Sequence, residues 1–231
     1  MKRTVKVGNV LMGDGSVSVQ SMTTVKTSDA EGCVAQILAL EKAGCDVARV
    51  AVSDEADAYA LKEVVPRVHV PVVADVHFSA RLAVLAVEMG ASKLRINPGN
   101  IGGEREIALV ADCVKAHGVP VRVGANTGSI EKHFLEKYGR SAEALVGSAL
   151  YNAEILEKHG VHDIVLSVKA SDVPLTVEAY TMLAKRCDYP LHLGVTEAGT
   201  EEMGIVKSSV GIGALLLGGI GDTIRVSLPA D

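Results

Sequence analysis

The stretch KLRINPGNIGGEREIALVADCVKAHGVPVRVGAN, residues 93–126, contains one complete unit of the repeat that predicts the fold. Its first five residues alternate polar and apolar side chains, as a strand does, and Pro98 would end that strand. We expect a helix near 103–117, because Gly118 stands where such a helix would end, and VPVRVGAN (119–126) is typical of a second strand. A strand, a helix and a strand in this order predict two parallel strands.

The same unit recurs along the whole sequence. Segments rich in Val and Ile predict eight strands, at residues 17–22, 47–52, 70–76, 93–97, 119–126, 163–170, 190–197 and 222–228. Helices are expected between them, from Ser28-Asp29, from Ser53-Asp54, from Ser79, and near 103–117, 141–159, 173–187 and 201–217. Strands and helices that alternate in this way are typical of an α/β protein with a (β/α)8 TIM barrel.

We expect one substrate-binding domain over residues 1–231, made of a hairpin within 1–16 that turns at Gly13-Asp14-Gly15, and a barrel over 17–228. The chain stops directly after the last strand, so the eighth helix would be absent and side chains such as Ile224 and Val226 would lie in water. The alternative fold is a doubly wound open sheet. That fold usually carries a glycine-rich nucleotide loop after an early strand, and the sequence has no such loop.

The composition argues against several classes of protein. Hydrophobic residues make up 48% and charged residues 22% of the chain, a mixture typical of a soluble globular protein. The net charge of −5 argues against nucleic acid as a partner. No apolar run is long enough for a signal peptide or a membrane span, so we expect a cytoplasmic protein without a membrane partner. The four cysteines are scattered without a CxxC pair, which indicates free thiols.

Polar and charged side chains gather late in the predicted strands, where function lies in a barrel. Seven of the eight strands carry an ionisable residue there, although strands covered by helices should be apolar on both faces. The residues expected to face the site are Arg49, Asp75, His77, Arg95, Asn97, Arg122, Asn126, Lys169, Glu197, Arg225 and Ser227. Their five cations outnumber their two carboxylates, and arginine suits phosphate oxygens. We therefore predict a small substrate with one or two phosphates.

Three of these residues allow other chemistry. Asp75 and His77 could be metal ligands on one strand face, but barrels of that kind need more histidines than the sequence offers, and no metal site is expected. Lys169, on the sixth strand, could form a Schiff base as in some aldolase barrels, although a phosphate contact is favoured. Covalent trapping with borohydride would identify such an aldolase.

Six motifs run in order across nearly the whole chain: VQSMTT (19–24), ADVHF (74–78), RINPGNIG (95–102), VKASD (168–172), LGVTEAG (193–199) and GIGDTIRVSL (219–228). Together they resemble those of bacterial 4-hydroxy-3-methylbut-2-enyl diphosphate synthases. This family reductively opens the ring of 2-C-methyl-D-erythritol 2,4-cyclodiphosphate in isoprenoid biosynthesis. The resemblance implies substrate contacts for Arg49, Arg95, Arg122, Asn126, Lys169, Arg225 and Ser227. It also implies that Glu197 lies near the reacting carbon, as the catalytic residue.

The resemblance further implies parts that this sequence lacks. In the family, an eighth helix and a second domain follow the barrel, and three cysteines and a glutamate of that domain hold a [4Fe–4S] cluster. The sequence contains no such cysteine-rich segment, so this chain alone would be inactive. Flavodoxin or ferredoxin as electron donor, and a homodimer of the full-length protein, are implied as well. A non-catalytic diphosphate-binding module stays open as an alternative.

Overall fold

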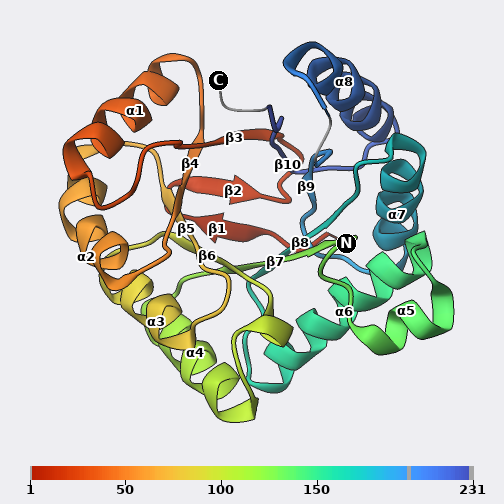
Figure 1. The fold of residues 1–231 in the computed structure, drawn as a ribbon, viewed down its shortest axis with the longest axis horizontal. Helices are drawn as coiled ribbons and strands as arrows, with labels where there is room; N and C mark the ends of the chain where they lie inside the picture. The colour runs from red at the N-terminus through yellow and green to blue at the C-terminus, as the bar shows by residue number, and fades with distance from the viewer. Residues whose placement is uncertain (1, 197–198, 229–231) are drawn as a thin grey trace.

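The computed structural model describes residues 2–196 and 199–228. Its centre is a sheet of eight parallel strands in the order β8-β7-β6-β5-β4-β3-β10-β9 (Figure 1). The strands are β3 (Ser18–Met22), β4 (Val47–Ala51), β5 (Val72–Asp75), β6 (Lys93–Ile96), β7 (Val121–Asn126), β8 (Ile164–Lys169), β9 (His192–Leu193) and β10 (Thr223–Ile224). Each predicted strand is present, and the expected parallel order is confirmed.

The sheet curves until its two edge strands meet. β10 pairs with β3, where Thr223 lies opposite Ser18, and pairs with β9 on its other side. A bridge between Leu166 and Leu191 joins β8 to β9. Because these contacts link each strand to the next around the ring, the structure is the predicted barrel, and the carboxyl ends of its strands surround one mouth.

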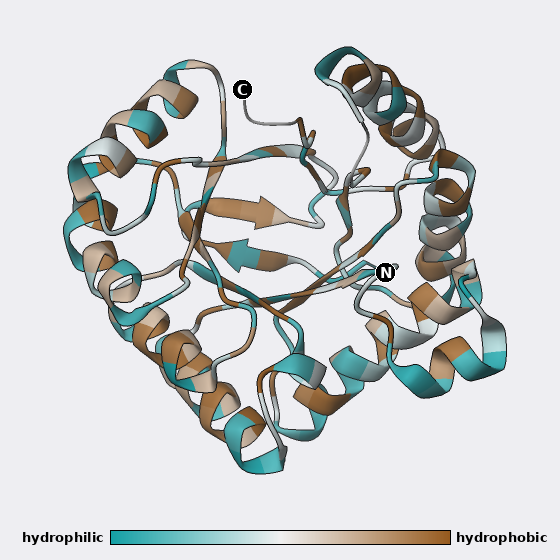
Figure 2. Ribbon diagram, viewed as in Figure 1, coloured by the Kyte–Doolittle hydropathy of each residue, from teal (hydrophilic) through white to brown (hydrophobic). Residues whose placement is uncertain are grey.

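Helices lie around the barrel and cover most of its outer face (Figure 1). They are α1 (Ala30–Lys42), α2 (Glu55–Val64), α3 (Ala80–Glu88), α4 (Glu104–His117), α5 (Lys132–Tyr138), α6 (Ala142–Lys158), α7 (Val173–Arg186) and α8 (Glu201–Leu217), with 3-10 turns η1 (Val65–Arg67) and η2 (Pro98–Asn100). Most begin at a residue whose side chain accepts a backbone N–H, namely Asp29, Asp54, Ser79, Ser141, Asp172 and Thr200. Apolar and polar residues alternate along the helices (Figure 2), and apolar residues such as Ile37, Leu61 and Leu183 are buried in the core. Within the described ranges, none of these helices is both long and apolar enough to cross a membrane.

A hairpin closes the N-terminal end of the barrel. Its strands β1 (Val5–Val7) and β2 (Val10–Met12) are antiparallel, so the turn lies at Gly8 and Asn9. The predicted turn at residues 13–15 is therefore wrong. Gly8 has a φ of 57°, a left-handed conformation that glycine adopts without strain and that suits a tight hairpin turn. The hairpin packs against the beginnings of barrel strands in an apolar cluster of Val5, Val7, Met12, Val47, Val73 and Val165.

Three details differ from the sequence prediction. The loop expected after residue 126 contains α5, a helix of seven residues. β9 and β10 have only two residues each, because the chain leaves the ladder before the predicted strand ends. Beyond the end of β10, Val226 is 45% exposed, as expected. Ile224 is half-buried and packs against the core, so the expectation that it lies in water is wrong.

Candidate functional site

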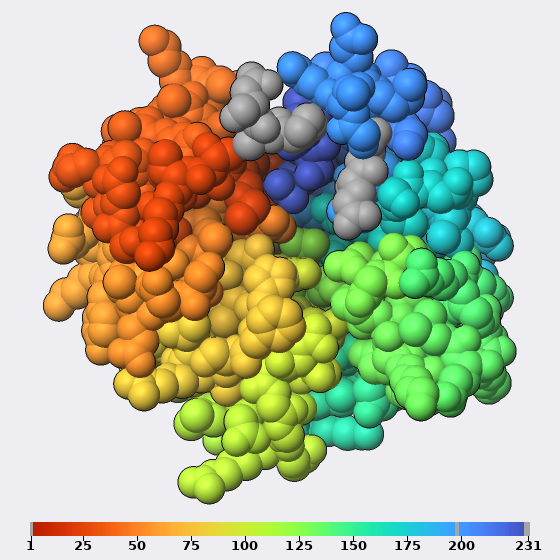
Figure 3. Space-filling view, viewed as in Figure 1, coloured from red at the N-terminus to blue at the C-terminus, as the bar shows by residue number. Residues whose placement is uncertain are grey.

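The carboxyl ends of the strands surround a cavity of about 290 Å³, on the face that Figure 3 shows with a recess near its centre. Eight of the predicted site residues line it, namely Arg49, Asp75, His77, Arg95, Arg122, Asn126, Lys169 and Arg225. Among the described residues of its lining are five cationic side chains and one carboxylate. The fold therefore concentrates positive charge in one place of a chain whose net charge is −5.

Asp75, at the end of β5, holds two of the arginines. Its Oδ1 lies 3.0 Å from Nη1 of Arg95, and its Oδ2 lies 3.5 Å from Nη2 of Arg49. The same Oδ2 lies 3.4 Å from Nε2 of His77. Burial by itself would raise the pKa of Asp75, but the hydrogen bond with His77 and the charges of the two arginines outweigh it and hold that pKa well below its ordinary value. The carboxylate is therefore ionised and fixes both guanidinium groups at the cavity wall.

Arg122 lies deep in the cavity and is 3% exposed. Its Nε and Nη2 donate to Oγ of Ser167 at 3.2 and 2.7 Å. Within the part of the chain that the structure describes, its Nη1 and the Nε of Arg95 have no hydrogen-bond acceptor. A buried donor without an acceptor costs about 1–3 kcal/mol. Both groups are thus available to an oxygen atom of a ligand in the cavity.

The cations of the cavity crowd one another. Burial, opposed by the carboxylate of Asp75 and reinforced by the charge of Arg225, lowers the pKa of Arg49 to about 10. Burial and the charge of Arg122 hold the pKa of Lys169 well below its ordinary value. An anion in the cavity would offset both the repulsion and the loss of hydration. The arrangement is therefore suited to binding negative charge.

Two glycines leave room for the cationic side chains. A Cβ atom on Gly124 would lie 3.3 Å from Nη2 of Arg122 and 3.4 Å from Nε of Arg95. A Cβ atom on Gly194 would lie 2.6 Å from Nζ of Lys169, closer than real Cβ contacts. The cavity can therefore hold these cationic side chains only because residues 124 and 194 are glycines without a Cβ atom.

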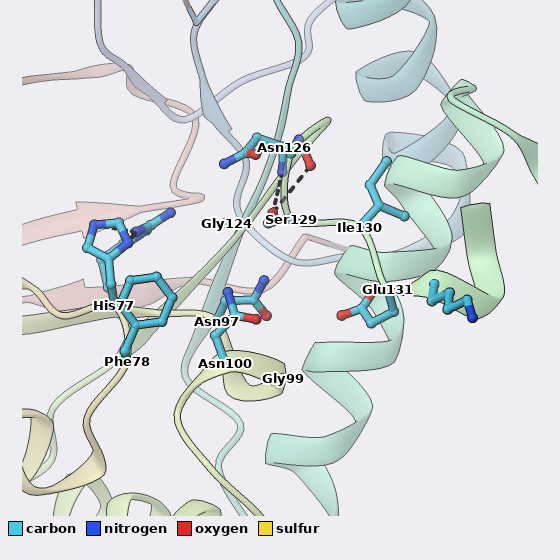
Figure 4. Close-up of a pocket in the computed structure, with 13 residues that line it drawn as sticks. His77, Phe78, Asn97, Gly99, Asn100, Gly124, Asn126, Ser129, Ile130 and Glu131 are labelled. Atoms are coloured by element: carbon cyan, nitrogen blue, oxygen red, sulfur yellow. Dashed lines mark hydrogen bonds between the residues drawn. The ribbon is translucent and has the colours of Figure 1, made fainter. Parts of the chain in front are cut away.

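A second cavity, of about 650 Å³, adjoins the first beside the loops that follow β6 and β7 (Figure 4). The two cavities share His77, Arg95, Gly124 and Asn126. Asn97 is 4% exposed and lines only the second cavity. Asn97 therefore lies beside Arg95 in the second cavity and not in the lining of the first.

Besides Asn97, the sequence prediction and the lining of the first cavity differ at several residues. Ser227 is half-buried and lines neither cavity. Glu197 lies outside the described residues, so its catalytic role stays a prediction. Met22 and Ser167 line the first cavity and were not predicted. Ser167 could have been predicted, because it lies two residues before Lys169 and therefore on the same face of the strand. Met22 lies in contact with Arg49, and no pattern in the sequence indicates that contact.

A further polar layer lies inside the barrel beneath the arginines. Gln20, Lys93 and His192 are almost completely buried, and Nζ of Lys93 lies 3.4 Å from Oε1 of Gln20. Neither ring nitrogen of His192 has a hydrogen-bond partner in the described part of the chain. Burial, followed by the charge of Arg122, holds the pKa of both Lys93 and His192 well below its ordinary value. Burial thus disfavours the charged forms of Lys93 and His192, which lie in the core beneath the cavity.

The cysteines do not fit an iron–sulfur cluster. Cys33 and Cys45 are buried, Cys113 and Cys187 are half-buried, and burial raises the pKa of all four thiols. A raised pKa favours the thiol, whereas iron binds the thiolate. Nowhere in residues 2–196 and 199–228 do three His, Cys, Asp or Glu side chains come together as metal ligands.

The sequence matches one family along nearly its full length. The family described as the GcpE TIM-barrel domain matches residues 2–231. The 4-hydroxy-3-methylbut-2-en-1-yl diphosphate synthase (flavodoxin) of Caldanaerobacter subterraneus subsp. tengcongensis is 53% identical over 233 residues, which cover 100% of this chain and 66% of that protein. The protein of the same name from Lysinibacillus sphaericus is 53% identical over 231 residues, covering 99% of this chain and 62% of that protein. The chain thus spans less than two thirds of the length of these relatives.

Solved structures share the fold at low sequence identity. A truncated 3-deoxy-D-arabino-heptulosonate 7-phosphate synthase from Thermotoga maritima has a TM-score of 0.69 and 14% identity, with 96% of this chain and 79% of that chain covered. The dihydropteroate synthase of Yersinia pestis has a TM-score of 0.68 and 12% identity, with 97% and 92% covered. These similarities support the barrel and carry no information on the substrate.

Proposed function

Because the chain belongs to the GcpE TIM-barrel family, we propose that it is the diphosphate-binding barrel of a 4-hydroxy-3-methylbut-2-en-1-yl diphosphate synthase. Its substrate would be 2-C-methyl-D-erythritol 2,4-cyclodiphosphate, whose ring is opened reductively. The observation that carries the proposal is the cavity in which five cationic side chains and one carboxylate meet at the barrel mouth. The names of the relatives support flavodoxin as the electron donor of the complete enzyme.

The arginines would bind the diphosphate oxygens. A guanidinium group donates two parallel hydrogen bonds to a phosphate, which gives both affinity and orientation. Arg95 is already held by Asp75 at 3.0 Å, so less free energy is lost in ordering it when the substrate binds. The unpartnered donors of Arg95 and Arg122 would gain the acceptors that they lack. In this proposal Lys169 contacts phosphate and does not act as a Schiff-base nucleophile.

The reduction needs electrons, which an iron–sulfur cluster supplies in an enzyme of this kind. The described residues of this chain do not form a site for such a cluster. We therefore propose that polypeptide outside this chain holds the cluster, and that this chain binds and orients the substrate. The chain alone is then expected to bind the cyclic diphosphate without converting it.

Glu197 is the proposed catalytic residue. A general acid is needed where a hydroxyl group leaves, and a carboxyl group can supply that proton. The support for this assignment is the neighbouring residue, Thr196, which lines the first cavity. The resemblance of LGVTEAG (193–199) to the family motif gives the same role.

The proposal predicts that Arg122→Ala weakens binding of the cyclic diphosphate in calorimetric titrations. Loss of a charge-assisted contact costs about 1.5–3 kcal/mol, which corresponds to roughly ten- to a hundredfold in affinity. Arg122→Lys should restore only part of it, because a point charge lacks the fork of the guanidinium group. Arg81→Ala is the matched control, since Arg81 is exposed on α3 and pairs with Glu55. Unchanged affinity in Arg122→Ala would show that the diphosphate does not bind in this cavity.

A further inference from the structure

The last residue of β3, Met22, lies beside the arginine cluster. Its register partner on the neighbouring strand β4 is Arg49, so the two side chains enter the cavity at the same height of the barrel. Both residues line the first cavity. Met22 is half-buried, whereas Arg49 is only 8% exposed. An uncharged, flexible side chain therefore stands next to a cation of the anion site.

The thioether of Met22 contacts the edge of Arg49 that a phosphate would use. Nε of Arg49 lies 3.2 Å from Sδ of Met22, and Nη2 lies 2.8 Å from the same atom, so both nitrogens donate to the sulfur. Parallel N–H groups of this kind form the edge with which a guanidinium group binds two oxygens of a phosphate. The sulfur thus takes the position that the oxygens of an anion would have.

The same edge of Arg122 is held in a different way. Its Nε and Nη2 donate to Oγ of Ser167, at 3.2 and 2.7 Å. Ser167 is short and fully buried, so it cannot move away from the arginine without disturbing the barrel. Met22 has a longer side chain with three rotatable bonds, and a thioether is a weaker acceptor than a hydroxyl group. Of these two partners, Met22 is the one that can withdraw.

Arg49 keeps another partner when Met22 withdraws. Its Nη2 lies 3.5 Å from Oδ2 of Asp75, and this nitrogen carries a second N–H group for the carboxylate. Replacement of the thioether by a phosphate would therefore exchange a weak, neutral acceptor for a strong, charged one while the guanidinium group stays at the cavity wall. Until then the sulfur supplies an acceptor for N–H groups that would otherwise be buried without one.

We propose that Met22 is a displaceable partner of Arg49: its thioether holds the guanidinium edge while no anion is bound, and withdraws when a phosphate accepts from that edge. Met22 is thus a positioning residue, which acts on the anion through Arg49. The inference rests on the proposed function, because it takes the phosphate oxygens to bind among the arginines. It implies that the thioether competes with the anion, so that binding is weaker than it would be without the sulfur.

The test is calorimetric titration of the 231-residue chain with inorganic pyrophosphate. Met22→Leu keeps the apolar volume and removes the sulfur, and it should lower the Kd about two- to fivefold, since a weak competing acceptor is lost. In an Arg49→Lys background, which lacks the guanidinium edge, the same replacement should leave the Kd unchanged. Met203→Leu is the matched control, because Met203 is exposed on α8 and lines neither cavity.

The methyl group of Met22 offers a direct readout by NMR. When the methionine methyl groups are labelled with carbon-13, the signal of Met22 is identified by its absence in Met22→Leu. Addition of pyrophosphate should shift this signal and make it narrower, because the side chain gains freedom when it leaves the guanidinium group. The signal of Met203 should not change. A signal of Met22 that broadens or stays as it was would contradict the withdrawal.

The outcomes separate the inference from the function on which it rests. Wild-type protein that binds pyrophosphate, with Met22→Leu binding it equally or more weakly, would overturn the inference and leave the proposed function intact. Tighter binding in Met22→Leu that persists in the Arg49→Lys background would show that leucine acts without Arg49, and would also overturn the inference. Wild-type protein that binds neither pyrophosphate nor the cyclic diphosphate of methylerythritol would overturn the proposed function and the inference together. Thermal unfolding of each variant excludes a loss caused by misfolding.

Discussion

Replacing Gly124 by alanine should block the anion site and leave the barrel folded. The new Cβ atom would stand 3.3 Å from Nη2 of Arg122 and from Oγ of Ser167, and 3.4 Å from Nε of Arg95. All three neighbours are side-chain atoms that can shift by a few tenths of an ångström, and Gly124 is not one of the glycines with positive φ. Overpacking of this mild kind should cost about 1–2 kcal/mol, or a fall in Tm of about 2–8 °C.

The effect on binding should be much larger than the effect on stability. A phosphate oxygen that accepts from the free Nε of Arg95 must lie about 2.7–2.9 Å from that nitrogen, and the methyl group, 3.4 Å from the same nitrogen, would compete with it for space. The oxygen would lose this hydrogen bond. The bond is worth about 1.5–3 kcal/mol, so the Kd should rise at least about tenfold.

The assay pairs calorimetric titration with pyrophosphate with thermal unfolding followed by circular dichroism. Gly213→Ala on α8 is the control, because a Cβ atom there meets nothing within 4 Å. Alanine in a helix stabilises by about 0.5–1 kcal/mol relative to glycine, so this variant should be slightly more stable and bind normally. If Gly124→Ala bound pyrophosphate as tightly as the wild-type protein, no oxygen of the anion could accept from Nε of Arg95.

Two further predictions concern buried amines. Binding of an anion should raise the depressed pKa of Lys169. The affinity for pyrophosphate should therefore be greatest below the pKa that Lys169 has in the free protein, and fall as the pH rises toward its pKa in the complex. Titrations across a pH series should show a smaller fall for Lys169→Met, and identical profiles for the two proteins would contradict the prediction. The pKa of Lys93 is lower in the folded than in the unfolded chain, so the unfolded chain binds more protons and stability falls as the pH drops below the unfolded pKa of about 10. Lys93→Met should remove this loss and gain about 1–3 kcal/mol at neutral pH in urea unfolding, whereas a less stable variant would show that the amine has a compensating partner.

The barrel could be predicted because its signals are local. Most predicted strands are short segments rich in Val and Ile. The helices begin at polar residues such as Asp29, Asp54 and Ser79, whose side chains accept a backbone N–H three residues later. Alternation along β6 and β7 also placed Arg95 and Arg122 on inward-facing positions. In a barrel these positions at the strand ends lie close together, so much of the arginine cluster followed from the strands alone.

The position of a side chain along the barrel axis could not be predicted, because alternation defines the face of a strand and not its depth. Lys93 and Arg95 share a face, yet Lys93 is fully buried beneath the cavity while Arg95 lines it. Contacts between loops were also beyond the sequence. Glu131 reaches Asn152 only because two loops and α6 come together, and no pattern in the sequence connects them.

The order of layers inside the barrel links the hairpin to the anion site. At the N-terminal end, Val47 and Val73 pack against the hairpin in an apolar layer. Lys93 and His192 lie above it, where burial disfavours their charged forms, and the arginines lie at the mouth. Because the apolar layer closes one end, water reaches the arginines from the mouth, and an anion that fills the cavity displaces it. Attraction between charges strengthens as water is excluded, so the burial that destabilises the cations in the empty cavity also strengthens their interaction with a phosphate.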